Sequence, residues 1–265
     1  MGERLGQHLL INKTAIPKII AALDLQPNER VIEIGPGMGA LTLPLAEVCR
    51  KINCQLVAIE KDLDLMNQMK DLNIKGLEII PGDALKVLPK LLASNTGRQT
   101  SNIKLIGNIP YYITGQLLRI LSEAENPPKI SVLMVQEEVA ERICSTPPKM
   151  NLLSAITQFW AQPELILRLK PGDFDPPPKV NSAVIRLTTK QLTTNDKLQI
   201  AGYYRLAKVI FKQPRKTAAN NLADGLEITK KEAVNLIKSV GLQENSRPQD
   251  FNLDQLIKLS TITTK

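Results

Sequence analysis

Histidine and cysteine are scarce in this chain of 265 residues, and the shortage excludes several kinds of site. His8 is the one histidine, and the three cysteines, Cys49, Cys54 and Cys144, do not have the spacing of metal ligands. A zinc site of histidine and cysteine, or a catalytic triad that depends on histidine, is therefore not expected. We expect reduced cysteines that serve packing, and no bound metal.

The chain also lacks a hydrophobic run that could cross a membrane. A spanning helix needs roughly 20 consecutive apolar residues, and no stretch approaches that length. The opening Met1-Gly2-Glu3-Arg4 is not followed by the apolar region of a secretory signal. We therefore expect a cytoplasmic protein without a membrane partner.

Aromatic residues make up 3% of the chain, yet three of them stand in proline-rich turns. A core needs no ring at Tyr111, Tyr112 or Phe174, so we expect exposed rings that stack on flat substrates. The plainer alternative is that each ring fills a local packing gap. The net charge of +8 and the pI near 9.3 predict a polyanionic partner, with nucleic acid as the first choice.

Short apolar runs alternate with helical periodicity over the first two thirds of the chain. Such alternation predicts an α/β domain with a parallel, doubly wound sheet. The polar segment Asn95–Asn102 is interpreted as a surface loop. The expected strands are Val31–Ile34, Leu56–Ile59, Leu77–Ile80, Ile103–Ile106, Ile130–Val135, Glu164–Leu169 and Ser182–Thr188; the expected helices are Lys13–Leu25, Leu41–Cys49, Leu63–Leu72, Leu85–Leu92, Gly115–Glu123 and one from Glu137.

The pattern changes near residue 190, where β/α alternation gives way to helical periodicity alone. We therefore predict two domains, residues 1–190 and 191–265, the second small and helical. Its expected helices are Lys197–Phe211, Pro214–Ala223, Thr229–Ser239 and Leu253–Leu259.

A glycine-rich turn joins the first expected strand to the first helix after it. Gly35, Gly37 and Gly39 let the backbone approach a ligand and present helix N-terminal amides to it. The same spacing, with Ala40, also fits the dinucleotide fingerprint, and Glu60 follows the second strand where a ribose-binding acid is expected. The glycines alone do not distinguish a nicotinamide cofactor from S-adenosylmethionine.

Acidic residues at the same edge of the sheet favour S-adenosylmethionine. Glu33 places a carboxylate in the strand end, and Asp83 follows the third strand. Such a rim suits a cationic cofactor that contains adenosine. Glu60 would hold the ribose hydroxyls, Asp83 the adenine amino group, and the turn at Gly35 and Gly37 the amino-acid moiety. A simple helix N-cap is the alternative role of Asp83.

The segment Gly107-Asn108-Ile109-Pro110-Tyr111 follows the fourth expected strand and is the most specific signal in the chain. An exocyclic adenine amine is a poor nucleophile with two hydrogens that can be held. The Asn108 side-chain carbonyl and the Pro110 backbone carbonyl could each accept one, and Tyr111 could stack on the flipped base. A loop stabilised by an Asx turn is the alternative.

With these residues in view, the chain resembles the ribosomal RNA adenine N6,N6-dimethyltransferases, specifically the housekeeping enzymes that act on small-subunit rRNA. The similarity runs nearly from end to end. The matching segments are Gly6–Ile11, Val31–Thr42, Ile59–Asp62, Gly82–Ala84, Gly107–Tyr111, Gln136–Val139 with Arg142, and Phe174–Val184.

The resemblance implies a Rossmann-like class I methyltransferase with a seven-stranded sheet and a small helical C-terminal domain. It implies dimethylation of two adjacent adenosines in the 3′-terminal hairpin of small-subunit rRNA, with S-adenosylhomocysteine as product, on a subunit assembly intermediate and by a monomer. The implied cofactor contacts are His8, Leu10, Glu33, Gly35, Gly37, Glu60, Asp83, Ala84 and Asn108; the implied catalytic residues are Asn108, Pro110, Tyr111 and Phe174.

Leu9, Asn12 and Tyr112 depart from the family pattern, as does the basic run near residue 214, which has one arginine fewer than usual. That basic run belongs to a stretch without acids that we interpret as an RNA-phosphate surface, with a solvated helix face as the alternative. Its cations are Arg205, Lys208, Lys212, Arg215 and Lys216.

Three other functions remain as alternatives. One is the antibiotic-resistance branch that methylates adenine N6 in large-subunit rRNA; Gly39–Thr42 and the C-terminal Arg215–Thr217 and Arg247–Asp250 favour the housekeeping branch. Another is a transcription factor of the same fold, against which the intact Asn108–Tyr111 segment argues. The last is a nicotinamide-dependent oxidoreductase, which leaves that segment unexplained.

Overall fold

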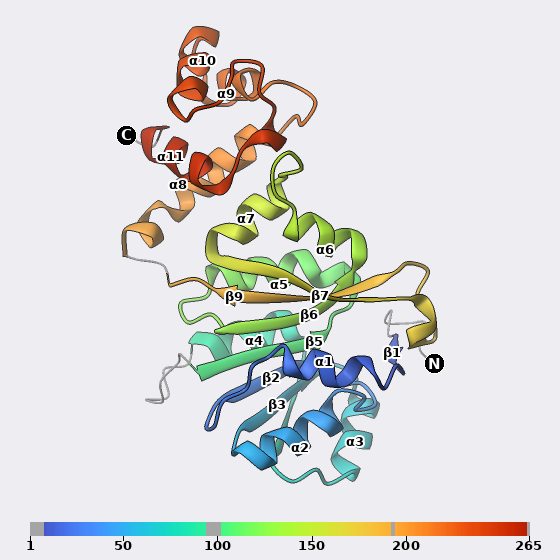
Figure 1. The fold of residues 1–265 in the computed structure, drawn as a ribbon. Coiled ribbons are helices and arrows are strands. Elements are labelled where there is room, and N and C mark those ends of the chain that lie inside the picture. The colour runs from blue at the N-terminus through green and yellow to red at the C-terminus, as the bar shows by residue number, and fades with distance from the viewer. Residues whose placement is uncertain (1–7, 94–101, 192–193, 264–265) are drawn as a thin grey trace. The chain divides into compact units, whose positions relative to one another are not determined.

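The computed structural model of the chain describes residues 8–93, 102–191 and 194–263, so most of the predicted loop at residues 95–102 lies outside the described part (Figure 1). Contacts between Cα atoms divide the chain into two compact units. The first comprises Met1–Ala140 and Gln162–Thr189, and the second comprises Glu141–Ala161 and Lys190–Lys265. The second unit thus takes in a segment that precedes the boundary expected near residue 190.

A seven-stranded, mostly parallel sheet forms the centre of the first unit and confirms the predicted α/β fold. The strand order is β4-β3-β2-β5-β6-β9-β7. The first five strands in this order are parallel to one another, and β9 is antiparallel to β6. Its strands are β2 (Arg30–Ile34), β3 (Gln55–Glu60), β4 (Leu77–Pro81), β5 (Ile103–Asn108), β6 (Ile130–Gln136), β7 (Ala161–Leu169) and β9 (Ser182–Thr189).

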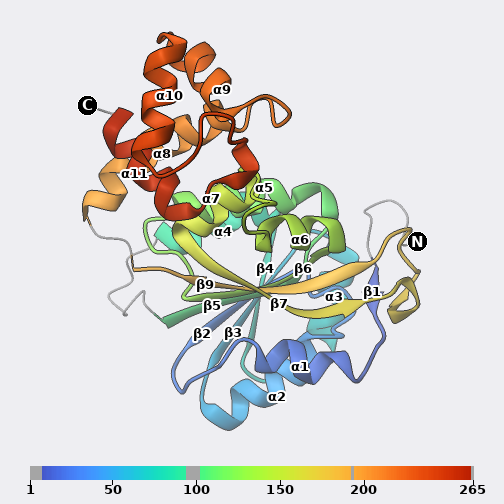
Figure 2. The same cartoon turned by 45° about the horizontal axis from the view of Figure 1, so that its top comes forward.

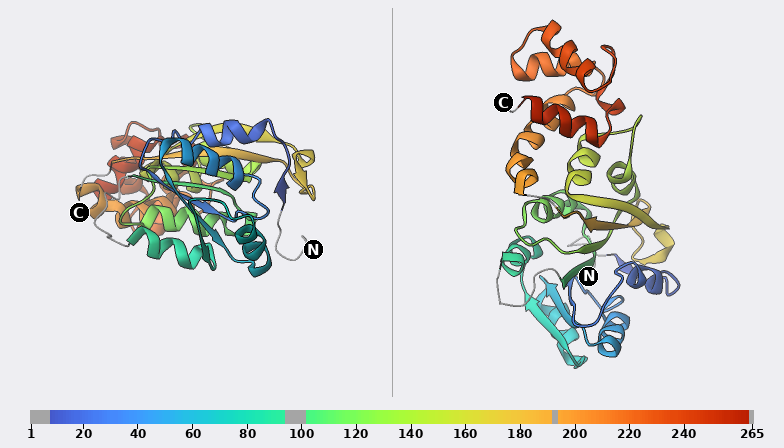
Figure 3. Two further views of the ribbon diagram at one scale, coloured as in Figure 1. Left: turned by 90° about the horizontal axis from the view of Figure 1, so that it is seen from below. Right: turned by 60° about the vertical axis from the view of Figure 1, so that its left-hand side comes forward.

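The register of the parallel strands brings their carboxyl ends to one edge of the sheet. Ile34 is opposite both Ile59 and Gly107, and Glu60 is opposite Pro81. Helices cover both faces, with α1 and α2 on one side and α4 and α5 on the other (Figure 3). The bounds are α1 (Ala15–Ala21), α2 (Thr42–Ile52), α3 (Leu63–Asp71), α4 (Ala84–Ala93), α5 (Thr114–Glu123) and α6 (Glu137–Cys144).

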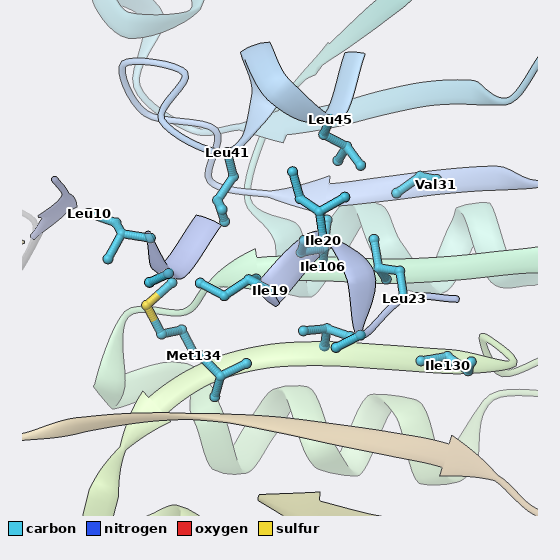
Figure 4. Packing of buried hydrophobic residues seen from close by; sticks show 14 of the residues in the cluster. Leu10, Ile19, Ile20, Leu23, Val31, Leu41, Leu45, Ile106, Ile130 and Met134 are labelled. Carbon is cyan, nitrogen blue, oxygen red and sulfur yellow. The ribbon is translucent and has the colours of Figure 1, made fainter. Parts of the chain in front are cut away.

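A hydrophobic core between α1, α2 and the sheet holds the site edge in place. Figure 4 shows Ile19, Ile20 and Leu23, from α1 and the turn after it, packed over the strands near Ile106 of β5. Leu10, 3% exposed, belongs to the same cluster. Burial of a leucine or isoleucine side chain stabilises a fold by about 1.5–3 kcal/mol, so Leu10 anchors the described part, residues 8–11, of the matching segment Gly6–Ile11, called the N-terminal motif below.

A small second sheet, which the sequence pattern did not predict, joins β1 (Leu9–Leu10) to β8 (Phe174–Asp175). The strands are antiparallel, with Leu9 opposite Asp175 and Leu10 opposite Phe174. Two residues are too few to show a periodicity of two, so pairing alone reveals these strands. The sheet ties the N-terminal motif to the segment Phe174–Val184, called the proline-rich segment below.

The second unit is helical (Figure 2), and several of its helix starts differ from expectation; α8, for example, begins at Thr194, three residues before the predicted Lys197. A separate α7 begins at Leu152, because Asn151 accepts hydrogen bonds from the Leu153 and Ser154 amides as an N-cap. Helix α9 begins at Ala218 and not at the predicted Pro214, because Thr217 caps it. The bounds are α7 (Leu152–Trp160), α8 (Thr194–Ile210), α9 (Ala218–Leu226), α10 (Lys230–Ser239) and α11 (Leu253–Thr263).

None of the helices in the described ranges is long and apolar enough to cross a membrane. The three cysteines, all within those ranges, form no disulfide, and Cys49 is buried. Cys49 belongs to the hydrophobic cluster and Cys54 packs against it, as expected of packing cysteines, and Cys144 is half-buried.

Candidate active site

The glycine-rich turn between β2 and α2 has the backbone conformation that its glycines allow. Gly35, Gly37 and Gly39 have φ angles of +65°, +55° and +87°, a region that other residues rarely adopt. The space where a side chain at Gly37 would begin is open, with no atom within 4 Å. The turn therefore leaves room for a ligand against its backbone.

Glu60, at the end of β3, holds this turn through its side chain. Its Oε2 atom accepts a hydrogen bond from the Gly37 amide at 3.2 Å, and its Oε1 atom accepts from the Lys61 and Asp62 amides at 2.8 and 2.9 Å. The side chain is 4% exposed. The carboxylate is thus fixed at the sheet edge, where it can accept hydrogen bonds from vicinal hydroxyls.

Among the described residues, Glu33 is a buried acid without an ion-pair partner. It is 1% exposed, and within the described residues its Oε2 atom has no hydrogen-bond partner. Burial raises its pKa to about 8; the Thr42 hydroxyl opposes this rise and the Glu60 carboxylate adds to it. The group is therefore mostly protonated at neutral pH, and a nearby cation would favour its ionised form.

Asp83 follows β4 and has two interactions at once. Its Oδ1 atom accepts a hydrogen bond from the Leu85 amide at 3.0 Å, so it caps α4, and its Oδ2 atom lies 3.3 Å from the Lys61 ammonium. Burial alone would raise the pKa of Asp83, but the Leu85 amide and Lys61 outweigh it and lower the pKa. Asp83 therefore caps α4 and also offers an ionised acceptor. Ala84 beside it is buried.

Asn108 ends β5 and is oriented by the N-terminal motif. Its Nδ2 atom donates to the His8 backbone carbonyl at 2.6 Å. This bond orients the side-chain amide, and the Oδ1 atom of the same amide can accept a hydrogen bond from a ligand. The Pro110 carbonyl accepts from the Ile113 amide at 3.0 Å, and a carbonyl oxygen can accept a second bond. The two oxygens that the sequence singled out are therefore both able to accept hydrogens.

The Tyr111 side chain joins three segments that are far apart in the sequence. Its hydroxyl lies 2.7 Å from Ser182 Oγ, and its ring stacks with His8, with centroids 6.1 Å apart. His8 Nδ1 in turn lies 2.8 Å from the Pro176 carbonyl oxygen. The N-terminal motif, the Asn108–Tyr111 loop and the proline-rich segment thus form one site, all within the first unit.

The predicted exposed ring at Phe174 is wrong. Phe174 is 3% exposed and belongs to the hydrophobic core, because its pairing with Leu10 in the small sheet directs the ring inward. Tyr111 is half-buried, whereas Tyr112 is 69% exposed. Of the three rings, Tyr112 is the one that solvent reaches freely.

Three residues that shape the site were given no role of their own from the sequence alone. Gly107 packs so closely that a Cβ atom there would lie 2.8 Å from the Ile34 carbonyl oxygen. Asn12 donates to Asp173 Oδ1 at 2.8 Å and so reinforces the small sheet, and Ser182 holds the Tyr111 hydroxyl. The position of Gly107 directly before Asn108 was a signal of close packing that the sequence offered. No signal in the sequence indicated which residues Asn12 and Ser182 contact.

The five basic residues expected to contact RNA all lie in the second unit and are exposed. Arg205 and Lys208 are on α8, and the other three occupy the turn after it, which the Asn221 amide closes by donating to the Ile210 and Gln213 carbonyls. Lys216 pairs with Asp224 at 3.5 Å. Four of the five cations therefore remain without an acidic partner among the described residues.

A family model described as ribosomal RNA adenine dimethylase matches residues 2–265. Among curated proteins, the ribosomal RNA small subunit methyltransferase A of Dehalococcoides mccartyi strain CBDB1 is 36% identical over 258 residues, which cover 96% of this chain and 86% of the relative. The protein of the same name from Koribacter versatilis is 34% identical and covers 97% of this chain and 92% of the relative.

Two solved structures share the fold. A dimethyladenosine transferase from Plasmodium falciparum has a TM-score of 0.76 at 22% identity, over 95% of this chain and 96% of that one. The 23S rRNA methyltransferase ErmE has a TM-score of 0.74 at 21% identity, over 97% and 100%. The fold alone does not separate these two, but with the family match and the sequence relatives it leads to one assignment: the chain belongs to the ribosomal RNA adenine dimethylase family.

Proposed function

We propose that this chain dimethylates the N6 amines of two adjacent adenosines in the 3′-terminal hairpin of small-subunit rRNA, with S-adenosylmethionine as methyl donor. The observation that carries the proposal is the convergence of Asn108, Pro110 and Tyr111 beside an acid-rimmed glycine turn. The names of the sequence relatives support the small subunit. The substrate is an assembly intermediate of that subunit, and the enzyme acts as a cytoplasmic monomer.

The residues around the glycine turn fit S-adenosylmethionine. The buried Glu33 carboxyl, whose Oε2 atom has no hydrogen-bond partner among the described residues, and the open space at Gly37 suit a cationic amino-acid moiety, and Glu60 suits a ribose. Asp83 would accept from the adenine amino group, with Ala84 beside the ring and with His8 and Leu10 closing the site. The cofactor supplies an electrophilic methyl group on a sulfonium.

The chain's own part in the reaction is mainly positioning. Asn108 Oδ1 and the Pro110 carbonyl oxygen would each hold one hydrogen of the adenine amine and direct its lone pair toward the methyl group. Tyr111, whose hydroxyl and ring are both held, would stack on the flipped base. Phe174, buried behind this site, would support it through packing. No strong base is needed, because the methylated ammonium is acidic.

We further propose that residues 1–190 bind cofactor and base and that residues 191–265 contact ribosomal RNA. Arg205, Lys208, Lys212, Arg215 and Lys216 would bind phosphates, which positions the RNA without specifying the base. The specificity for adenine then comes from the site and from the shape of the RNA.

The test uses radiolabelled S-adenosylmethionine with unmethylated small subunits, large subunits or naked rRNA, followed by mapping of the modified base. We expect label in two adjacent adenosines of small-subunit rRNA. Label confined to large subunits would instead establish the antibiotic-resistance type. Failure to bind S-adenosylmethionine, together with binding of a nicotinamide nucleotide, would support an oxidoreductase.

The substitution Asn108→Ala tests the proposed role of the side chain. It should leave the affinity for S-adenosylmethionine within a few-fold and lower kcat by roughly 10²–10³, the usual cost of removing one hydrogen-bonding group that acts in a transition state. Asn126→Ala is a matched control, because the Asn126 side chain also donates to a backbone carbonyl, that of Leu92, at 3.4 Å. Near-normal methyl transfer by Asn108→Ala would refute the role.

A further inference from the structure

Helix α8 carries a hollow of about 430 Å³ that the proposed chemistry does not use. Its lining residues on α8 and the turn after it include positions 201, 204, 205, 208, 209 and 212, which have helical spacing and so share one face. Gly225 of α9 completes the lining. The volume lies within the range of roughly 300–1,000 Å³ that is typical of pockets for small organic groups.

The rim of the hollow is basic and uncompensated. Arg205, Lys208 and Lys212 are exposed, and in the described part of the chain none of them pairs with an acid. Lys216, a short distance along the chain, differs in that Asp224 neutralises it. Three unpaired cations at successive turns of one helical face match the phosphates of a nucleic-acid backbone.

The floor and wall of the hollow are apolar and aromatic. Ala201 and Val209 contribute aliphatic surface, and a Cβ atom on Gly225 would lie too close to the Val209 side chain, so the glycine lets α9 approach α8 closely. The Tyr204 ring forms part of the lining and is held at its edge by Phe159, with centroids 6.0 Å apart. A held ring beside aliphatic surface offers a platform for a nucleobase.

We propose that this hollow binds one unpaired nucleotide of the RNA substrate, with its base against Tyr204 and Val209 and the adjoining phosphates on Arg205, Lys208 and Lys212. A regular RNA duplex keeps its bases stacked inside and offers only backbone and groove, so it would use the cations but not the apolar floor. The inference rests on the proposed rRNA function and adds that the contacted RNA has a bulged or looped nucleotide.

The test compares binding of a labelled single-stranded RNA of about 12 nucleotides and of an RNA duplex of about 12 base pairs to the full chain. Ala201→Phe fills the hollow and retains every charge, so it should weaken single-strand binding by about tenfold, in line with the usual worth of one stacked base, and change duplex binding less than about twofold. Lys208→Gln should weaken both, whereas the matched Lys231→Gln, on exposed α10 surface outside the hollow, should weaken neither by more than about twofold.

A second measurement uses the unaltered protein. Single-stranded RNA containing 4-thiouridine should crosslink to the peptide that contains Tyr204. Equal weakening of single strand and duplex by Ala201→Phe, or a crosslink that maps elsewhere, would overturn the proposal. Neither result depends on methyl transfer. A wild-type protein that failed to methylate small subunits would refute the proposed function, whereas the binding and crosslinking results would still decide whether the hollow binds a nucleotide.

Discussion

Gly107 shows how closely two strands approach at the catalytic edge of the sheet. A Cβ atom there would lie 2.8 Å from the Ile34 carbonyl oxygen and equally close to the Ile109 side chain. Backbone atoms inside a sheet cannot move aside easily, so a larger residue must displace β5 or the loop after it. The glycine is therefore needed to place Asn108.

We expect Gly107→Ala to lower the free energy of unfolding by about 1–3 kcal/mol, as overpacked sites do, and to lower methyl transfer more than cofactor affinity. Denaturant unfolding and initial rates measure the two effects. Gly115→Ala is the control: that glycine lies in α5, where an added Cβ atom would meet nothing within 4 Å, and alanine there should be neutral or stabilising. An equally stable Gly107→Ala protein would contradict the packing argument.

Glu33 gives the stability of the free protein a distinct pH dependence. Burial, opposed by Thr42 and assisted by Glu60, raises the pKa of its carboxyl from 4.5 to about 8 in the folded chain. Between these values the unfolded chain has released a proton that the folded chain retains, so stability falls as pH rises through this window. Below about pH 4.5 the penalty is absent, and above about 8 it is constant.

Glu33→Gln should remove this dependence, because glutamine is neutral at every pH. The stability of the wild-type protein relative to the variant should fall between about pH 5 and 8 by up to about 1.4 kcal/mol per pH unit, as measured by denaturant unfolding without cofactor. Glu47→Gln, which replaces an exposed glutamate on α2, is the control for the loss of a carboxylate as such. If the stability of the wild type and that of Glu33→Gln changed with pH in the same way, a raised pKa of Glu33 in the folded chain would be ruled out.

At the scale of elements, close approach depends on single small residues. The pair α8 and α9 is the clearest case, since a Cβ atom on Gly225 would overlap the Val209 side chain. The Val209 side chain is short and has little freedom to move away on a helix. The two helices, and the hollow that they border, therefore depend on this glycine.

Gly225→Ala should separate α8 from α9 and lower the unfolding free energy by about 1–3 kcal/mol. Val209→Ala in the same chain removes the clashing methyl groups, so the double variant should recover part of that loss. A double-mutant cycle measured by denaturant unfolding gives the coupling energy. Strict additivity of the two substitutions would mean that the helices do not meet at these residues.

At the scale of the whole molecule, the charge of +8 governs association with RNA. Each phosphate neutralised by a lysine or arginine releases condensed counterions, so affinity falls as salt rises. Lys212 and Arg215 occupy the exposed turn after α8, which the Asn221 amide holds closed. Because this turn is held in one conformation, we expect these two cations to bind particular phosphates of the RNA, in addition to the general electrostatic attraction of the net charge.

The double variant Lys212→Gln/Arg215→Gln should reduce the slope of log affinity against log salt by about 1 for each phosphate that is no longer neutralised. Fluorescence titration with small-subunit rRNA from low to moderate salt measures the slope. Lys51→Gln/Lys70→Gln removes the same charge from exposed helix positions in the first unit and should leave the slope nearly unchanged. The same slope for both variants would mean that net charge alone drives binding.

Much of the fold was predictable because parallel strands give apolar runs that stop at functional residues. The runs ending near Ile34, Ile59 and Ile106 matched β2, β3 and β5, since burial on both faces leaves little choice of residue. The start of α9 was missed because a helix cap at Thr217 overrides helical periodicity before it. Strands β1 and β8 were missed because their pairing is entirely non-local.

The sequence by itself determined the α/β order and the chemistry at each strand end, because residues after parallel strands must share one edge of the sheet. The tertiary structure alone decided how those groups are held. Asn108 bonds to a carbonyl 100 residues away, and His8 meets Pro176 across 168 residues. It also buried Phe174, which local sequence placed in an exposed turn. Such contacts depend on the three-dimensional path of the chain, and no periodicity in the sequence encodes them.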